Sequence, residues 1–312
     1  MNIVPSPAHL ILSRDEGVSH TERGWRDGSL VRMFRGVYVE REIWSELAPW
    51  QKQLVRVHAA IAAHPDRVIC NESAATLLGV LIAHPSRPVH VLTEGGASRE
   101  YRGIRSHVGV DPRELLEIDG IRLTDPAATA VDIARSRPPA EALAYADALL
   151  RIAPEPHDGT WAALNESMAS SRGRRQARWA LNHATGIPES VLESASLAVI
   201  EWLGYKAPVP QQTFQFEGHT DRGDFYWPDE NVLGEADGRV KYTDELGDPT
   251  NAIVTEKSRE NRLRRHLDGL ARWGWEELDE AELLDAALRG IGLRPVRPRD
   301  TLRLATFRRL GR

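Results

Sequence analysis

The chain of 312 residues contains a single cysteine, Cys70. One cysteine excludes an intramolecular disulfide framework and a zinc ribbon built on cysteine ligands. It favours a reducing compartment, so we expect a cytoplasmic protein. No apolar run approaches the roughly 20 residues that a membrane span requires. The N-terminus also lacks the charged, apolar and small-residue order of a secretory signal, so we expect no membrane partner.

An excess of positive charge is missing too, because 40 lysines and arginines face 45 aspartates and glutamates. The formal net charge is −5 at pH 7, which excludes a chain that is cationic throughout. Local basic clusters remain compatible with nucleic acid. They lie at residues 23–35, 172–178, 259–265 and 294–312. Each of them can equally be a solvated helix face.

Common catalytic motifs are absent from the sequence. It has no phosphate-binding loop, no dinucleotide fingerprint, no Gly-x-Ser-x-Gly and no paired histidines at zinc spacing. Charged residues make up 27% and hydrophobic residues 41% of the chain, which is ordinary for a globular protein. The length predicts two or three domains.

Residues 30–39 read as two short strands around Arg35, after short helical stretches at 8–14 and 21–26. This is the layout of a wing after a helix-turn-helix. The phrase LVRMFRGVYV resembles the degenerate N-terminal winged helix of AbiEi-type antitoxins. The resemblance implies a DNA-binding module in which Arg32 and Arg35 contact DNA.

The following residues alternate predicted helices and strands. The phrases ESAATLLG, VHV, GIRSH and LTDPAATAVDIA resemble, in their order, the middle domain of AbiEi-like proteins. We expect His107 and Asp132 there to be buried structural groups, and we assign no chemistry to this domain. A basic helix at 174–183 follows, and Arg174 and Arg175 are further candidate DNA contacts.

The segment 225–236 predicts a β-hairpin. Its apolar residues at 225–227 and 232–236 form two strands, and Pro-Asp-Glu-Asn between them is a turn sequence. A loop of these four residues places Trp227 opposite Val232.

Three carboxylates gather at the open end of this hairpin. Counting outward from the loop puts Asp224 opposite Glu235, and Asp237 projects from the same face as Glu235. Like charges across a ladder are destabilising unless a cation or a shifted pKa relieves them. The sequence therefore predicts a site for a divalent metal, Mg²⁺ or Mn²⁺, with Asp224 and Glu235 as its main ligands.

A glutamate on an upstream helix extends this pattern. The helix is predicted to start at Pro188 and end near Leu203, and Glu193 sits beside its apolar stripe, where it can face the sheet. An inward glutamate, an aspartate on one strand and Glu-x-Asp on the next follow the order of PD-(D/E)xK nucleases. Such a site holds a hard cation that activates water and neutralises a phosphoryl oxygen. Glu193 can hold a metal-bound water or a second ion.

Residues 188–288 resemble the very-short-patch-repair-like endonuclease domain that follows AbiEi-type modules in actinobacteria. The phrases are PESVLESASL, RGDFYWPDENVLGEADGRVKY and EKSRENRLRRHLDGLARWGWEEL. The resemblance implies an α/β/α restriction-endonuclease-like sandwich with a mixed sheet. It maps Glu193, Asp224, Glu235 and Asp237 onto the acidic positions of the family, so all four are candidate catalytic residues.

One position departs from the nuclease pattern. Asp237 stands where a lysine is usual, and Lys241 and Lys257 are the candidates for a displaced catalytic lysine. On the helix that carries Lys257, Arg259 and Arg262 can contact phosphates. The alternative for these arginines is an exposed helix face with ion pairs at helical spacing.

We therefore predict an α/β (α+β) protein in five segments. They are a winged-helix-like module (1–45), an AbiEi-like α/β domain (46–155), a linker with a basic helix (156–187), a nuclease-like domain (188–290) and a basic C-terminal tail (291–312). The sequence favours a metal-dependent DNA endonuclease. The alternatives are a non-catalytic AbiEi-type antitoxin or transcriptional repressor, and an interaction protein whose acidic domain binds a toxin. DNA is the expected partner, and a homodimer is compatible with the sequence.

Overall fold

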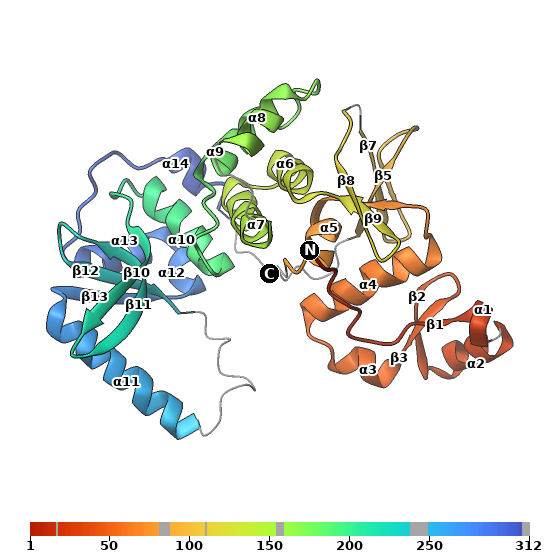
Figure 1. Ribbon diagram of the computed structural model, residues 1–312, viewed down its shortest axis with the longest axis horizontal. Coiled ribbons are helices and arrows are strands. Elements are labelled where there is room, and N and C mark those ends of the chain that lie inside the picture. The colour runs from red at the N-terminus through yellow and green to blue at the C-terminus, as the bar shows by residue number, and fades with distance from the viewer. Residues whose placement is uncertain (17, 81–87, 110, 154–158, 238–248, 308–312) are drawn as a thin grey trace. The chain divides into compact units, whose positions relative to one another are not determined.

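The computed structural model forms two compact units, each with helices and sheets of its own (Figure 1). It describes residues 1–16, 18–80, 88–109, 111–153, 159–237 and 249–307. Of these, unit 1 comprises 1–137 and 149–183, and unit 2 comprises 138–148 and 184–307. The described residues form 14 helices and three sheets, which confirms the predicted α/β (α+β) class.

Unit 1 begins with a small three-stranded sheet in the order β1-β3-β2. Its elements are β1 (Ile11–Leu12), α1 (Ser13–Glu16), α2 (Val18–Asp27), β2 (Leu30–Phe34), β3 (Val37–Glu40), α3 (Arg41–Glu46) and α4 (Pro49–Ala63). As predicted for a wing, β2 and β3 pair antiparallel around Arg35. The predicted helix at 8–14 is wrong, because Ile11 and Leu12 pair with β3 as a short strand.

A six-stranded mixed sheet follows in unit 1, in the order β6-β7-β5-β4-β9-β8. Its strands are β4 (Val68–Ile69), β5 (Val89–Thr93), β6 (Arg99–Tyr101), β7 (Ile104–Val108), β8 (Leu115–Ile118) and β9 (Ile121–Thr124). Helices α5 (Asn71–Leu77) and α6 (Pro126–Ser136) accompany it. Asp125 starts α6 by accepting a hydrogen bond from the Ala128 amide at 2.7 Å, as an N-cap aspartate should.

Three more helices come next along the chain, α7 (Pro139–Ile152), α8 (Thr160–Ser167) and α9 (Arg174–His183). Helices α8 and α9 lie in unit 1, where Arg135 of α6 donates to the Asn165 side chain at 2.8 Å and to the Ser170 carbonyl at 2.9 Å. The segment predicted as a linker with a basic helix is therefore folded onto α6 as far as His183.

Unit 2 is built on a four-stranded sheet in the order β10-β11-β12-β13. Its main elements are α10 (Val191–Trp202), β10 (Val209–Phe216), β11 (His219–Trp227), β12 (Val232–Ala236), α11 (Pro249–His266) and β13 (Gly269–Trp273). The first three strands are antiparallel, and β13 runs parallel to β12. Trp227 pairs with Val232, which confirms the hairpin register predicted from the turn length.

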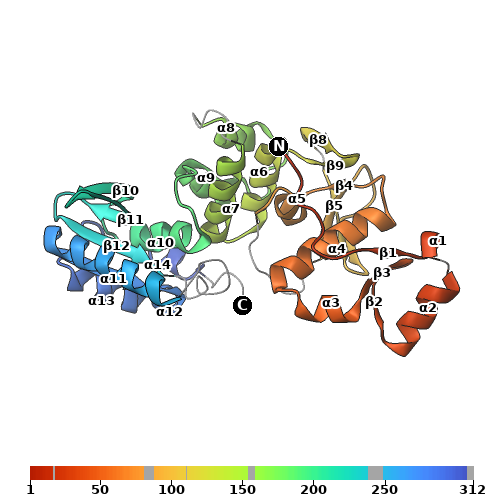
Figure 2. The same cartoon turned by 60° about the horizontal axis from the view of Figure 1, so that its bottom comes forward.

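Side chains along β12 and β13 point alternately to the two faces of this sheet, so the core of unit 2 has one part on each face. Figure 2 shows α11 running along the sheet, and its Leu263, with Leu267 just after the helix, packs with Leu233 and Leu270. Burying each leucine stabilises the fold by about 1.5–3 kcal/mol. On the other face, Trp273 donates to the Ser196 hydroxyl of α10 at 2.9 Å. The sheet therefore lies between α10 and α11.

The C-terminal segment closes unit 2. It contains α12 (Trp275–Asp279), α13 (Ala281–Gly290) and α14 (Thr301–Leu304). The Val296 amide donates to the Gly204 carbonyl at 2.9 Å, and the Asp300 amide donates to the Trp202 carbonyl at 2.8 Å. The predicted basic tail is thus folded against the end of α10 over its described part. No helix in the described ranges is long and apolar enough to cross a membrane.

Candidate functional site

The acidic hairpin brings Asp224 to β12, where it was predicted. The regular pairing of β11 with β12 ends at Phe225 and Gly234, one position before Asp224 and Glu235. Beyond that pair, Asp224 Oδ2 accepts a hydrogen bond from the Ala236 amide at 2.8 Å. The carboxylate thus takes a donor from the neighbouring strand at the point where the ladder stops.

Glu235 is the best-paired carboxylate of the group. It is 7% exposed and accepts from Arg259 Nη2 at 2.5 Å and from Arg272 Nε at 2.8 Å. Glu256 contacts the same two arginines at 3.1 Å and 2.5 Å. Burial lowers the pKa of Arg259. The hydrogen bond to Glu235 and the negative charge of Glu235 outweigh this effect, so the pKa of Arg259 is raised above its ordinary value. Two carboxylates and two guanidinium groups therefore form an ion-pair cluster, and Glu260 lies 3.8 Å from Arg272 at its edge.

Glu193 lies in the first turn of α10, which Ser190 caps. Its amide donates to Ser190 Oγ at 3.1 Å, and its Oε2 accepts from the Glu189 amide at 2.8 Å. The Gln211 side-chain amide also donates to Glu193 Oε2 at 2.7 Å and to Asp224 Oδ1 at 3.2 Å. The structure therefore joins Glu193 to Asp224 through one amide group.

Gln211 was not among the predicted site residues. The register of β10 on β11 is unshifted, since Pro210 pairs with Phe225 and Gln212 pairs with Gly223, so Gln211 stands opposite Asp224. Its φ of 53° lies in the left-handed region, which is uncommon for a residue with a side chain. No glycine or turn sequence marks this backbone conformation, so the sequence carried no signal for it.

The other predicted catalytic residues do not complete a metal site. Asp237 is exposed, and its amide donates to the Trp273 carbonyl at 2.8 Å. Lys257 is exposed on α11, and Lys241 lies outside the described residues. Within the described ranges, no three side chains of His, Cys, Asp or Glu are grouped to hold a metal ion. As arranged, Glu235 accepts from arginines, and Asp224 and Glu193 accept from amide donors.

Three of the six predicted DNA-contacting arginines are occupied by protein groups. Arg262 makes two hydrogen bonds of 2.7 Å to Asp221, and Arg259 belongs to the Glu235 cluster. Arg174 donates to the carbonyls of Met168 and Ser170. For α11, the structure shows the ion-paired helix face that was the alternative prediction.

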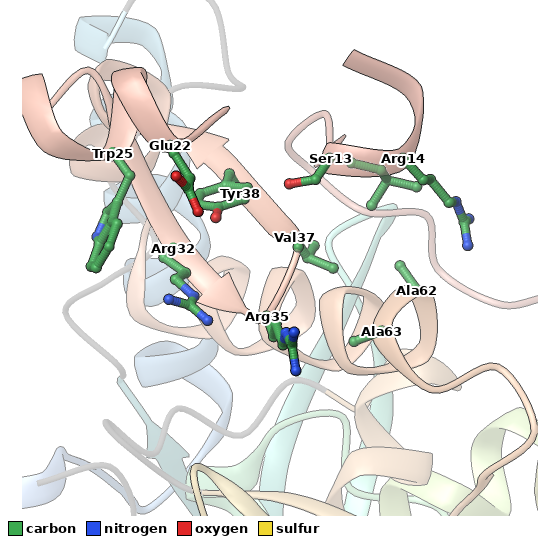
Figure 3. A pocket seen from close by; sticks show the side chains of 12 residues that line it. Ser13, Arg14, Glu22, Trp25, Arg32, Arg35, Val37, Tyr38, Ala62 and Ala63 are labelled. Atoms are coloured by element: carbon green, nitrogen blue, oxygen red, sulfur yellow. The ribbon is translucent and has the colours of Figure 1, made fainter. Parts of the chain in front are cut away.

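The remaining three arginines, Arg32, Arg35 and Arg175, are exposed. Arg32 and Arg35 line a cavity of about 510 Å³ between the wing, α2 and α4. Figure 3 shows both arginines on the wing, with Glu22 and Trp25 of α2 beside them. The Arg32 guanidinium lies 5.3 Å from the centre of the Trp25 ring, which is 46% exposed.

Two small residues hold α2 against the sheet and leave its outer face free. A Cβ on Gly24 would lie 2.8 Å from the Leu30 side chain, so only glycine permits this approach. Thr21 is fully buried and shares a hydrogen bond of 2.7 Å with Ser13. Seven of the described side chains of α2 are exposed as a result: Ser19, His20, Glu22, Arg23, Trp25, Arg26 and Asp27.

A buried polar cluster lies under the six-stranded sheet of unit 1. His90 Nδ1 is 2.9 Å from His107 Nε2 and 3.3 Å from Glu72 Oε2, and Arg137 forms an ion pair with Glu72. Burial lowers the pKa of His90 to about 4, against the opposing charge of Glu72. His107 thus belongs to a buried hydrogen-bonded group.

Comparison with known proteins supports one part of the predicted resemblance. The chain is 29% identical over 270 residues to uncharacterized proteins from two strains of Mycobacterium tuberculosis. The matched region covers 78% of this chain and 94% of each relative. No solved structure matches the chain. Residues 67–182, from β4 to α9, match the family of the AbiEi antitoxin C-terminal domain.

Proposed function

We propose that this protein is a DNA-binding protein of the AbiEi antitoxin kind, which represses transcription through its N-terminal module. The observation that carries this proposal is the outer face of α2, which presents its polar, basic and aromatic side chains beside the arginines of the wing. A helix of this size fits the major groove, where its side chains read base edges. Wing arginines then contact backbone phosphates and fix the position of the helix.

Binding to the DNA upstream of the protein's own gene tests the proposal. Fluorescence anisotropy at several salt concentrations gives the affinity and the salt slope, which measures the number of phosphates neutralised. Replacing Arg23 and Arg26 of α2 by alanine should weaken binding to the specific duplex more than to an unrelated one. Each lost base contact reduces discrimination by about 1–3 kcal/mol, or roughly 5- to 150-fold.

A matched control is available in the same unit. Arg122 and Arg172 are exposed arginines outside α2 and the wing, and their replacement by alanine removes the same charge. This control variant should bind both duplexes about as tightly as the wild-type protein. Absence of wild-type binding at about 0.1 M salt would rule out the proposed repressor function.

The antitoxin part of the proposal rests on the match of residues 67–182. A toxin partner is expected to bind this segment and to be encoded beside it, with a nucleotidyltransferase-like neighbour as the first candidate. Co-expression of the two proteins and co-purification on a tag placed on the toxin tests this. Toxicity that is unchanged by co-expression would count against the antitoxin function.

Metal-dependent DNA cleavage is a second candidate function. It is supported by the acidic residues on α10, β11 and β12, which follow the nuclease order, and by Asp224 reaching β12 beside Glu235. It ranks second because the carboxylates are already satisfied by arginine and amide donors. Cleavage of supercoiled plasmid with Mg²⁺ or Mn²⁺, lost in both Asp224→Asn and Glu235→Gln, would support it. Activity that survives both substitutions would place the chemistry elsewhere.

A further inference from the structure

Unit 1 contains a second cavity, of about 630 Å³, between the wing and the hairpin of β6 and β7. Basic side chains dominate its lining, and no carboxylate-bearing residue is among the lining residues. The basic residues are Arg32, Arg35, His64, Arg67, Arg99 and Arg102. Arg32 and Arg35 also line the cavity beside α2, whose lining includes Glu22, so the two cavities share these two arginines.

None of the five arginines in this cavity forms an ion pair with a carboxylate of the described residues. The nearest acidic residue along β6 is Glu100, which pairs with Arg105 at 2.9 Å. The arginines of α11 are different, since Arg259 and Arg262 are both held by carboxylates. Unpaired cations around one cavity repel one another, and a multiply charged anion relieves that repulsion.

The hairpin places one of these arginines at a conformational cost. Tyr101 pairs with Ile104, so Arg102 and Gly103 form a two-residue loop in which both have positive φ, 49° and 78°. Glycine or asparagine suits such a turn, whereas a residue like arginine costs about 1–2 kcal/mol there. The conformational cost of arginine at this turn is explained when its positive charge binds a ligand. The exposed Tyr101 ring, 5.0 Å from the Arg102 guanidinium, adds a flat contact surface.

We infer that the hairpin of β6 and β7 is a second DNA-contacting element, which holds the backbone of the same duplex that α2 and the wing engage. This inference rests on the proposed DNA binding. The planar guanidinium groups of Arg99 and Arg102 match the geometry of phosphate oxygens, and Arg32 and Arg35, which line both cavities, link the wing to the hairpin along the same backbone. Contacts of this kind add affinity without sequence preference.

The test replaces Arg99 and Arg102 together by alanine and measures anisotropy with specific and unrelated duplexes. Losing two phosphate contacts lowers the slope of log K against log salt by about 1.8 in magnitude and weakens binding about 30-fold at about 0.15 M salt. Both duplexes lose affinity equally. The variant with lysine at both positions should keep the wild-type slope, and the Arg122→Ala, Arg172→Ala control should match the wild type.

Two results separate this inference from the proposed function. If the alanine variant of Arg99 and Arg102 is folded by circular dichroism and keeps the wild-type slope, the hairpin does not hold DNA. If it keeps that slope but no longer co-purifies with the toxin, the cavity binds a protein partner, and the inference is overturned. If the wild-type protein binds no duplex, the proposed function itself fails.

Discussion

Replacing Glu235 by glutamine distinguishes an ion-pair role from a metal-ligand role for this residue. The two roles predict changes of opposite sign in the stability of unit 2. In the structure, Glu235 pairs with Arg259 and Arg272, so glutamine leaves these two partly buried cations with Glu256, and with Glu260 at 3.8 Å from Arg272, as charged partners. As a metal ligand, Glu235 would instead repel Asp224 in the metal-free protein. Glutamine would then remove a repulsion and stabilise unit 2.

The expected size of the loss follows from the burial of the two arginines. Removing one partner of a fully buried ion pair costs about 3–5 kcal/mol. The Arg259 and Arg272 side chains retain 22% and 29% of their accessible surface, so solvent screens part of the uncompensated charge. We therefore expect a loss of about 2–3 kcal/mol, which lowers the melting temperature of a domain of this size by roughly 8–12 °C.

Thermal unfolding in EDTA at pH 7, followed by calorimetry, measures this change in the transition of unit 2. The control is Glu230→Gln, since Glu230 is an exposed carboxylate in the turn of the same hairpin and should leave the transition unchanged. A Glu235→Gln protein that melts at or above the wild-type temperature would refute the ion-pair interpretation. Stabilisation of the wild type by Mg²⁺, absent from this variant, would then support a metal site.

Two further predictions concern the core of each unit. Gly234→Ala should destabilise unit 2 by about 2–3 kcal/mol in denaturant unfolding, because the new Cβ would lie 2.2 Å from the Trp273 ring. In the control Gly290→Ala, the new Cβ meets nothing within 4 Å, so this variant should be neutral or stabilising. For His90, burial puts the folded pKa at about 4, below the ordinary value near 6.5, so the unfolded chain takes up the proton first. Protonation of His90 in the unfolded chain therefore lowers the free energy of unfolding by up to about 3 kcal/mol as pH falls from 6.5 to 4. Chemical unfolding of the His90→Gln variant should show a correspondingly weaker pH dependence between these two pH values.

Local chemistry made several elements predictable. The four-residue turn and the strict alternation of strands determined that Trp227 faces Val232 and that Asp224 approaches β12. The wing followed from two apolar runs around Arg35. Each of these depends on residues close together in sequence, so the information lies within one short window.

The charge partners of those residues were decided by the tertiary structure alone. Sequence places Glu235 on a face of a strand, but Arg259 and Arg272 reach it only because α11 packs on that face and β13 pairs beside β12. The same packing places Glu235 in an ion-pair cluster. In unit 1, the wing and the β6–β7 hairpin line one cavity although they are far apart in sequence. No sequence pattern indicates that their arginines lie together in a lining without carboxylates. Periodicity fixes which way a side chain points, whereas the partner it meets depends on how distant segments pack.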